Sequence, residues 1–142
     1  MNIDHVCIAV RSIPATRKRL CEILGYAEKT QVVKNTRQDV LVQFFSKEGS
    51  LDIKIIQPAS PESPLKNFLK SRGEGLHHLC FKTDDVHQTM SALTERGARI
   101  TADPLPGEAF DDELIAFAYV AGGLNIEVID TDKRRDLINS AQ

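Results

Sequence analysis

The sequence predicts an α+β fold of two tandem βαβββ modules, related by a pseudo-twofold axis and forming a cupped mixed sheet around a central cavity. Three observations lead to this prediction. The chain matches itself at a shift of 73 residues, and each half holds one helix-like pattern among four strand-like patterns. The length of 142 residues also suits two small modules that share one core.

The internal match is carried by three segments at the same shift. In the first, IDHVCI at 3–8 lies over LHHLCF at 76–81, so that His5 coincides with His78. The other two segments pair 42–44 with 115–117 and 49–56 with 122–129. Chance can match one hexapeptide, but three matches at one shift indicate duplication of a single module.

Each element of the first half has a local signal. Residues 3–10 are apolar and β-branched, which is typical of a strand. Ser12 is a suitable helix cap, Pro14 stands in the first helical turn, and Gly25 ends the helix. Three further strands are expected near 29–34, 39–46 and 51–57.

The second half repeats this order after a turn-rich linker. Asp85 can cap its helix and Gly97 ends it, with strands expected near 98–102, 113–120 and 124–130. A short helix at 65–71 is expected in the linker, and a frayed or weakly helical tail at the end. The predicted organisation is a first module at 1–57, the linker at 58–75, a second module at 76–131 and a polar tail at 132–142.

Charge and composition narrow the function classes. The net charge is −2, and no apolar run approaches the roughly 20 residues of a membrane helix, so neither a nucleic-acid nor a membrane partner is expected. Three cysteines, an odd count without a secretory signal, indicate reduced thiols and a cytoplasmic location. The expected partner is therefore a small-molecule substrate.

Side-chain alternation along the strands predicts the site. His5 and His78 occupy equivalent positions on the first strands of the modules, and Lys54 and Glu127 occupy equivalent positions on the last strands. A pseudo-twofold pairing would bring these four groups into one cavity. Two imidazoles and a carboxylate suit a divalent ion such as Co²⁺, Ni²⁺, Zn²⁺ or Fe²⁺, which nominates His5, His78 and Glu127 as metal ligands.

The same residues have plainer structural interpretations. A single histidine on an apolar strand is usually a hydrogen-bonded core residue, although two at equivalent positions favour a shared site. Glu127 stands in an apolar strand, so it needs either solvent or a partner such as a metal or Lys54.

The neighbouring histidines and cysteines are assigned lesser roles. Cys7 and Cys80 are interpreted as small side chains that line the cavity and contact the substrate. His77 is expected to point outward because it alternates with His78, and His87 to be an exposed helix residue.

Three stretches, IDHVCIAV, GEGLHHLCFKTDDV and GGLNIEVID, together with the paired modules, resemble the vicinal oxygen chelate superfamily, also called glyoxalase/bleomycin resistance/dioxygenase proteins. Within it, the linker and second histidine strand, IIQPASPESPLKNFLKSRGEGLHHLCFKTDDV, are most similar to methylmalonyl-CoA epimerases. The resemblance covers residues 3 to about 130.

The resemblance implies a metal held by one histidine and one Gln or Glu from each module. His5, His78 and Glu127 match that pattern, but the fourth position is Lys54, whose ammonium has no lone pair for a metal. A general-base carboxylate found in some members corresponds here to Val42. The loop PLPGEAFDDE is acidic and poor in glycine where epimerases tend to be glycine-rich.

The first function that follows is a metal-dependent enzyme, either an epimerase-like isomerase or a glyoxalase-type lyase. It would stabilise the enolate of a dicarbonyl substrate, an acyl-CoA by resemblance alone. Glu127 and Lys54 are the acid–base candidates, with Gln43, Cys7 and Cys80 as substrate contacts.

Two other functions remain open. A metal-free binding or resistance protein would use Lys54 to neutralise Glu127 in a buried pair. An Fe²⁺ dioxygenase would use the two histidines and Glu127 as ligands. Because superfamily members often dimerise, a homodimer is one expectation, with His5 and His78 serving either the same site or different ones.

Overall fold

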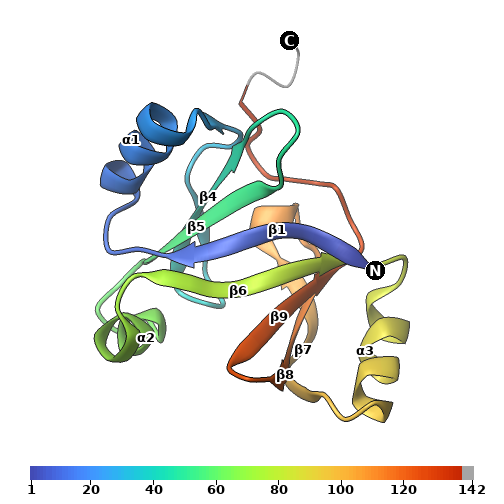
Figure 1. Ribbon diagram of the computed structural model, residues 1–142. Helices are drawn as coiled ribbons and strands as arrows, with labels where there is room; N and C mark the ends of the chain where they lie inside the picture. The colour runs from blue at the N-terminus through green and yellow to red at the C-terminus, as the bar shows by residue number, and fades with distance from the viewer. Residues whose placement is uncertain (139–142) are drawn as a thin grey trace.

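The computed structural model describes residues 1–138, and in that part of the chain it contains three α-helices and an open mixed sheet of nine strands. Side by side, the strands run β2–β4–β5–β1–β6–β9–β8–β7, with β3 paired onto β4. Figure 1 shows this sheet curving from the β4 side to the β7 side. The predicted α+β fold of paired modules is confirmed.

The first half begins with a helix whose ends follow the sequence signals. The side chain of Ser12 accepts the Ala15 N–H, and Gly25 closes the helix with a left-handed φ of 74°. The elements of this half are β1 (Asn2–Ala9), α1 (Ile13–Leu24), β2 (Ala27–Glu28), β3 (Val33–Asn35), β4 (Val40–Ser46) and β5 (Asp52–Pro58).

The second half has the same order of elements behind a linker helix. Asp85 caps its long helix by accepting the Gln88 N–H. The elements are α2 (Leu65–Arg72), β6 (Gly75–Lys82), α3 (Val86–Glu95), β7 (Arg99–Gly107), the 3₁₀-helix η1 (Glu108–Phe110), β8 (Glu113–Ala121) and β9 (Leu124–Ile129). Across the described residues, every helix is too short or too polar to cross a membrane.

The two halves join at the centre of the sheet. Strand β1 pairs antiparallel with β6, and each of these strands pairs in parallel with the last strand of its own half, β1 with β5 and β6 with β9. The four strands that carry the predicted site therefore lie together in the middle of the sheet (Figure 1). The site residues His5 and His78 meet within one chain.

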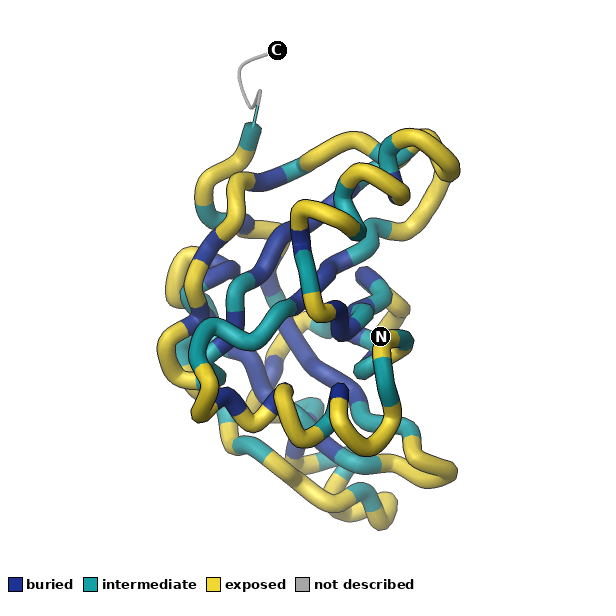
Figure 2. The backbone as a smooth tube through the Cα atoms, turned by 90° about the vertical axis from the view of Figure 1, so that its left-hand side faces the viewer, coloured by how far each residue is buried: buried dark blue, intermediate teal, exposed yellow. Residues whose placement is uncertain are grey.

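Helices cover the sheet unevenly. Helix α1 packs over β4 and β5 through Ile13 and Leu20, and α3 packs over β8 and β9 through Val86 and Met90. A third core cluster, which includes Phe44, occupies the other face, where α2 and η1 contribute. Figure 2 shows buried backbone concentrated in the central strands and exposed backbone in the loops and helix surfaces.

Two sequence predictions need correction. The strand expected at 29–34 is split into the short β2 and β3, because Gln31 N–H donates to the Asp136 carbonyl instead of continuing along β4. The described part of the tail, 132–138, is neither frayed nor helical. It crosses back over the sheet and forms a bridge between Thr30 and Leu137.

Candidate functional site

Four predicted residues meet around one carboxylate oxygen. Glu127 Oε1 accepts a hydrogen bond from Lys54 Nζ at 2.8 Å. His78 Nε2 lies 3.2 Å from the same oxygen and His5 Nε2 lies 3.3 Å from it. All four residues are buried, with at most 5% of any of them exposed. Equivalent strands of the two halves thus bring the two histidines, Lys54 and Glu127 together in one cluster, as the repeat predicted.

Part of this cluster has the composition of a metal centre. Ligand atoms of His5, His78 and Glu127 all lie within 4.8 Å of one another. Two buried polar atoms, His5 Nε2 and Glu127 Oε2, have no hydrogen-bond partner among the described residues. Nitrogen and carboxylate donors of this kind suit a first-row divalent ion, so these groups could bind a metal.

The charge of Lys54 does not fit a divalent ion at the same place. Burial lowers the pKa of Lys54, but the Glu127 carboxylate outweighs it and raises the pKa above the usual value. A divalent ion about 4 Å from this ammonium would be repelled by roughly 8 kcal/mol at an effective dielectric constant near 20. The lysine therefore supplies the cation that the carboxylate requires.

Glu127 is correspondingly held as an anion. Burial raises the pKa of its carboxyl group, but the Lys54 ammonium and the hydrogen bond from His78 lower it well below the usual value. A buried carboxylate without such partners would be strongly destabilising. Lys54 and Glu127 thus stabilise each other's ionised form.

The two histidines are held from behind by the residues that precede them. Asp4 Oδ2 lies 2.7 Å from His5 Nδ1, and His77 Nδ1 lies 2.8 Å from His78 Nδ1. Burial lowers the pKa of His78 to about 3 and that of His77 to about 4, so both rings are neutral at physiological pH.

His77 does not point outward as strand alternation predicted. The β1–β6 ladder pairs Cys7 with His78 and Ile8 with Leu76, which leaves His77 opposite no residue in a β-bulge. Such a bulge redirects a side chain and disturbs strict alternation. The His77 ring consequently packs edge-on against His78, at a centroid distance of 5.1 Å.

A cavity of about 480 Å³ opens onto this cluster. Lys54 and His78 reach it directly, whereas His5 and Glu127 are not among the side chains that line it. Its other polar lining residues are Arg37, Gln38, His77, Thr101 and Asn125, and its apolar ones include Val40, Ile56, Leu65 and Phe117. An acidic ligand in this cavity would meet Lys54 at the inner end and Arg37 on the lining.

The three predicted substrate contacts, Cys7, Cys80 and Gln43, are not among the residues that line the cavity. Cys7 and Cys80 share a face with the histidines but have no exposed surface, so they pack beneath the cluster. Burial raises the pKa of the Cys7 thiol to about 12 and raises that of Cys80 as well, which keeps both protonated. Gln43 lies on the opposite face of β4, where its amide donates to Glu28 and Thr30.

Val42, at the position of a family carboxylate, is an apolar core residue, 3% exposed. The acidic loop contributes Phe110, which stacks on His5 at a centroid distance of 6.1 Å.

Sequence reasoning missed Asp4 and Arg134, which together support His5 from behind. An acidic residue directly before His5 could have indicated the role of Asp4, but no local sequence pattern links Arg134 to the first strand.

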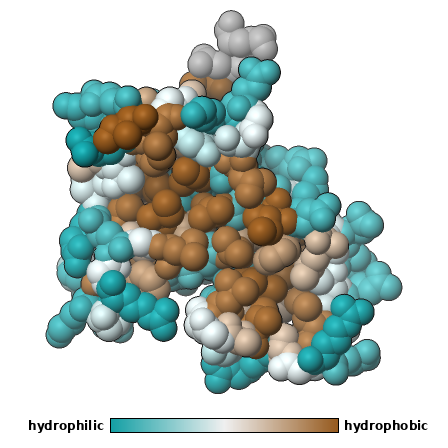
Figure 3. All heavy atoms as spheres, in the orientation of Figure 1, coloured by the Kyte–Doolittle hydropathy of each residue, from teal (hydrophilic) through white to brown (hydrophobic). Residues whose placement is uncertain are grey.

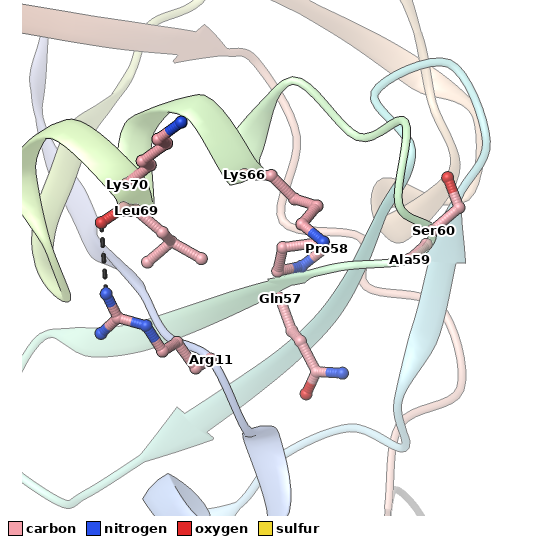
Figure 4. Close-up of a pocket in the computed structure, with 8 residues that line it drawn as sticks. All are labelled: Arg11, Gln57, Pro58, Ala59, Ser60, Lys66, Leu69 and Lys70. Atoms are coloured by element: carbon pink, nitrogen blue, oxygen red, sulfur yellow. Dashed lines mark hydrogen bonds between the residues drawn. The ribbon is translucent and has the colours of Figure 1, made fainter.

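A second cavity, of about 470 Å³, lies at the C-terminal end of β5 (Figure 4). Lys66 and Lys70 approach it from α2, and Arg11 donates to the Leu69 carbonyl at its edge. The predicted site residues are absent from its lining, so it is separate from the His–Lys–Glu cluster.

Comparison with known proteins agrees with this geometry. Residues 4–119 match the model of the Glyoxalase/Bleomycin resistance protein/Dioxygenase superfamily. The uncharacterized protein YqjC of Bacillus subtilis is 33% identical over 115 residues, covering 81% of this chain and 80% of that protein.

Named enzymes are among the relatives. The mitochondrial methylmalonyl-CoA epimerase of Dictyostelium discoideum is 30% identical over 73% of this chain, although the match spans only 61% of that protein. The crystal structure of methylmalonyl-CoA epimerase from Mycobacterium tuberculosis superposes with a TM-score of 0.81 at 26% identity, covering 91% of this chain and 87% of that one. The chain therefore belongs to the Glyoxalase/Bleomycin resistance protein/Dioxygenase superfamily.

Proposed function

We propose that the protein is an epimerase-like isomerase that removes and returns the α-proton of a carboxyl-bearing acyl thioester. The observation that carries this proposal is the Lys54 ammonium, held 2.8 Å from Glu127 at the inner end of the cavity. Several relatives are methylmalonyl-CoA epimerases, which supports the substrate class.

The cavity suits an anionic substrate. Lys54 reaches its inner end, and Arg37 lines it from the turn between β3 and β4. The guanidinium of Arg37 makes one long hydrogen bond, 3.5 Å, to the Pro106 carbonyl, which leaves donors available for a carboxylate. A substrate with a free carboxylate can therefore contact Arg37 while its thioester oxygen contacts Lys54.

Lys54 provides the electrostatic part of the mechanism. When the α-proton leaves, its electron pair moves into the carbonyl and gives an enolate with negative charge on oxygen. A preorganised ammonium in a buried site stabilises this charge more strongly than water would. Glu127 keeps Lys54 protonated for this purpose.

The neutral histidine pair provides a path for the proton. His77 lines the cavity, its Nδ1 contacts His78 Nδ1, and His78 Nε2 contacts Glu127. A proton taken from the substrate by His77 can pass along this chain toward Glu127 while the other imidazole nitrogens exchange theirs. Lys54, reaching the cavity from β5, can return a proton from a different direction.

The decisive experiment follows the substrate α-proton. We expect the protein to catalyse incorporation of deuterium from D₂O into methylmalonyl-CoA, measured by mass spectrometry. The double variant Lys54→Met with Glu127→Gln removes both charges together, so it preserves folding, and it is expected to lose at least about a hundredfold in exchange rate. Lys18→Met, on the exposed surface of α1, is the matched control.

Two results would contradict this proposal. One is the absence of exchange in the wild-type protein with malonyl-type thioesters. The other is undiminished exchange in the double variant, which would remove Lys54 and Glu127 from the chemistry.

A metal-free binding protein is the second candidate, because the Lys54–Glu127 pair neutralises the cluster without any added ion. Such a protein would bind a planar or acidic ligand in the cavity tightly and leave it unchanged. Calorimetric binding without deuterium exchange would favour it over the isomerase.

Metal-dependent forms of the chemistry require the three candidate ligands to bind a cation beside Lys54. The charge of Lys54 opposes both the metal-dependent isomerase and the Fe²⁺ dioxygenase in the same way. The metal content of freshly purified protein tests both functions. A stoichiometric ion that is lost in His5→Ala would favour a metal-dependent mechanism over the metal-free one.

We further propose that the protein forms a homodimer through the outer face of its central strands. Figure 3 shows a broad apolar area across this face, between the helices. Its central ladder consists of the pairs Ile3–Phe81, Val6–Leu79 and Ile8–Leu76. Leu76 is 57% exposed and Ile3 39% exposed, which is a large apolar surface for an isolated chain.

A further inference from the structure

The C-terminal segment, residues 132–138, places one buried cation against the site. Arg134 is 5% exposed, and its Nη2 donates to Asp4 Oδ2 at 2.6 Å. The guanidinium lies over the rings of Phe44 and Phe110, 4.7 and 4.8 Å from their centroids. A cation is retained at this depth only beside a counter-charge, which Asp4 provides.

Backbone hydrogen bonds hold this segment against both halves of the molecule. Arg135 N–H donates to the Ala109 carbonyl of η1, at 2.9 Å. Gln31 N–H donates to the Asp136 carbonyl and Ile138 N–H donates to the Lys29 carbonyl, each also at 2.9 Å. The position of Arg134 is therefore fixed by the residues that follow it in the segment.

Asp4 transmits this position to His5. Asp4 Oδ2 accepts a hydrogen bond from Arg134 Nη2 at 2.6 Å, and this permanently charged guanidinium pairs with an ionised carboxylate. An ionised carboxylate can only accept hydrogen bonds. The Asp4 contact at 2.7 Å therefore requires a hydrogen on His5 Nδ1.

The consequence appears at the other ring nitrogen. A neutral imidazole with its hydrogen on Nδ1 carries a lone pair on Nε2. That atom lies 3.3 Å from Glu127 Oε1 and has no hydrogen-bond partner among the described residues. The lone pair thus faces the Lys54–Glu127 pair, and Oε1 receives donors from Lys54 and His78 alone.

We propose that Arg134 is a positioning residue: by fixing Asp4, it locks His5 in the tautomer whose Nε2 is a permanent hydrogen-bond acceptor. In this tautomer His5 cannot donate to Glu127, which preserves the ability of Glu127 to take a proton through His78. This catalytic consequence rests on the proposed isomerase function, whereas the tautomer itself does not.

The test is the tautomer of His5, read by long-range ¹H–¹⁵N correlation at one fixed neutral pH, with the resonance assigned by a His5→Gln variant. The wild-type protein is expected to carry hydrogen on Nδ1 only. Asp4→Ala removes the acceptor beside His5 Nδ1, so the hydrogen is expected to move to Nε2, which lies 3.3 Å from Glu127 Oε1.

Two Arg134 variants separate positioning from folding. Arg134→Met should give a mixture of both tautomers, and Arg134→Lys, which keeps a cation for Asp4, should restore the wild-type spectrum. The control is Arg135→Met, which loses only ion pairs with Asp111 and Asp112 and should leave the tautomer unchanged. Circular dichroism of each variant verifies the fold.

The outcomes are distinct. Hydrogen on Nε2 of His5 in the wild-type protein, alone or together with Nδ1, overturns the inference, as does an Nδ1 tautomer that persists in both Asp4→Ala and Arg134→Met. If the tautomer responds as expected but neither the wild-type protein nor any variant exchanges the substrate α-proton, the role of Arg134 in fixing the His5 tautomer is supported and the isomerase function is contradicted. Where exchange is present, Asp4→Ala should lower its rate at least tenfold.

Discussion

The two halves of the sheet present matching residues to the site and differ mainly in charge. His5 and His78 are equivalent, and each packs edge-on against an equivalent phenylalanine, Phe44 at 5.1 Å and Phe117 at 5.5 Å. The last strands differ, since β5 contributes the cation Lys54 and β9 the anion Glu127. One duplicated framework thus holds an internal ion pair across its axis.

A second difference concerns the residue before each histidine. In the first half an ionised Asp4 allows only one tautomer of His5, whereas in the second half the imidazole of His77 can either donate to His78 or accept from it. The first histidine is therefore fixed and the second can exchange its proton. The pseudo-twofold symmetry thus places the two histidines, and the differences between the halves determine how each histidine can handle a proton.

The largest expected effect comes from making the two halves more alike in charge. Lys54→Gln removes the ammonium and places an amide oxygen beside His5, His78 and Glu127. Because the repulsion removed is roughly 8 kcal/mol, we expect Co²⁺ or Zn²⁺ affinity to rise at least a hundredfold. Mass spectrometry after dialysis should give near one ion per chain, and adding His5→Ala should abolish it.

Equal metal content in the wild-type protein and in Lys54→Gln would mean that Lys54 does not occupy the place of the cation. Lys18→Gln serves as the matched control, since it removes a lysine charge from the surface of α1 without touching the site.

Breaking the ion pair from one side should cost stability. Lys54→Met leaves Glu127 buried without its cation, so the free energy of unfolding is expected to fall by about 3–5 kcal/mol. The double variant with Glu127→Gln removes both charges and should recover most of that loss. Urea denaturation of the four proteins in this cycle measures the coupling, and additive single effects would show that the pair contributes no coupling of its own.

The proposed dimer face can be compared with another exposed apolar position. Leu76→Glu introduces a charge at the Ile8–Leu76 end of the central ladder and is expected to convert the protein to monomers in sedimentation equilibrium. Leu105→Glu, on β7 and similarly exposed at 50%, should leave the assembly unchanged. A wild-type protein that is already monomeric at micromolar concentration would contradict the dimer directly.

The repeat explains how much of this molecule the sequence could predict. Matching His5 with His78 and Lys54 with Glu127 was enough to predict the paired modules and the cluster, because equivalent strands of a pseudo-twofold occupy equivalent places. His77 and Gln43 were harder, since a bulge and a side chain on the opposite face of β4 are not visible in a repeat alignment. Arg134 lies outside the repeat, so its contact with Asp4 depends on tertiary structure alone.

The smallest expected effect concerns a contact between the halves outside the site. Glu108 Oε1 accepts hydrogen bonds from the N–H and hydroxyl of Thr36, which lowers the pKa of this carboxyl group. A lowered folded-state pKa contributes stability above the unfolded value of 4.5, and that contribution is lost as the pH falls through the folded value. Glu108→Gln should therefore cost about 0.5 kcal/mol at pH 7 and almost nothing in acid, because the contact is partly exposed. The urea midpoint of each protein is measured from pH 7 down to pH 3. If the difference between the two midpoints does not change with pH, the charge of Glu108 does not contribute to stability.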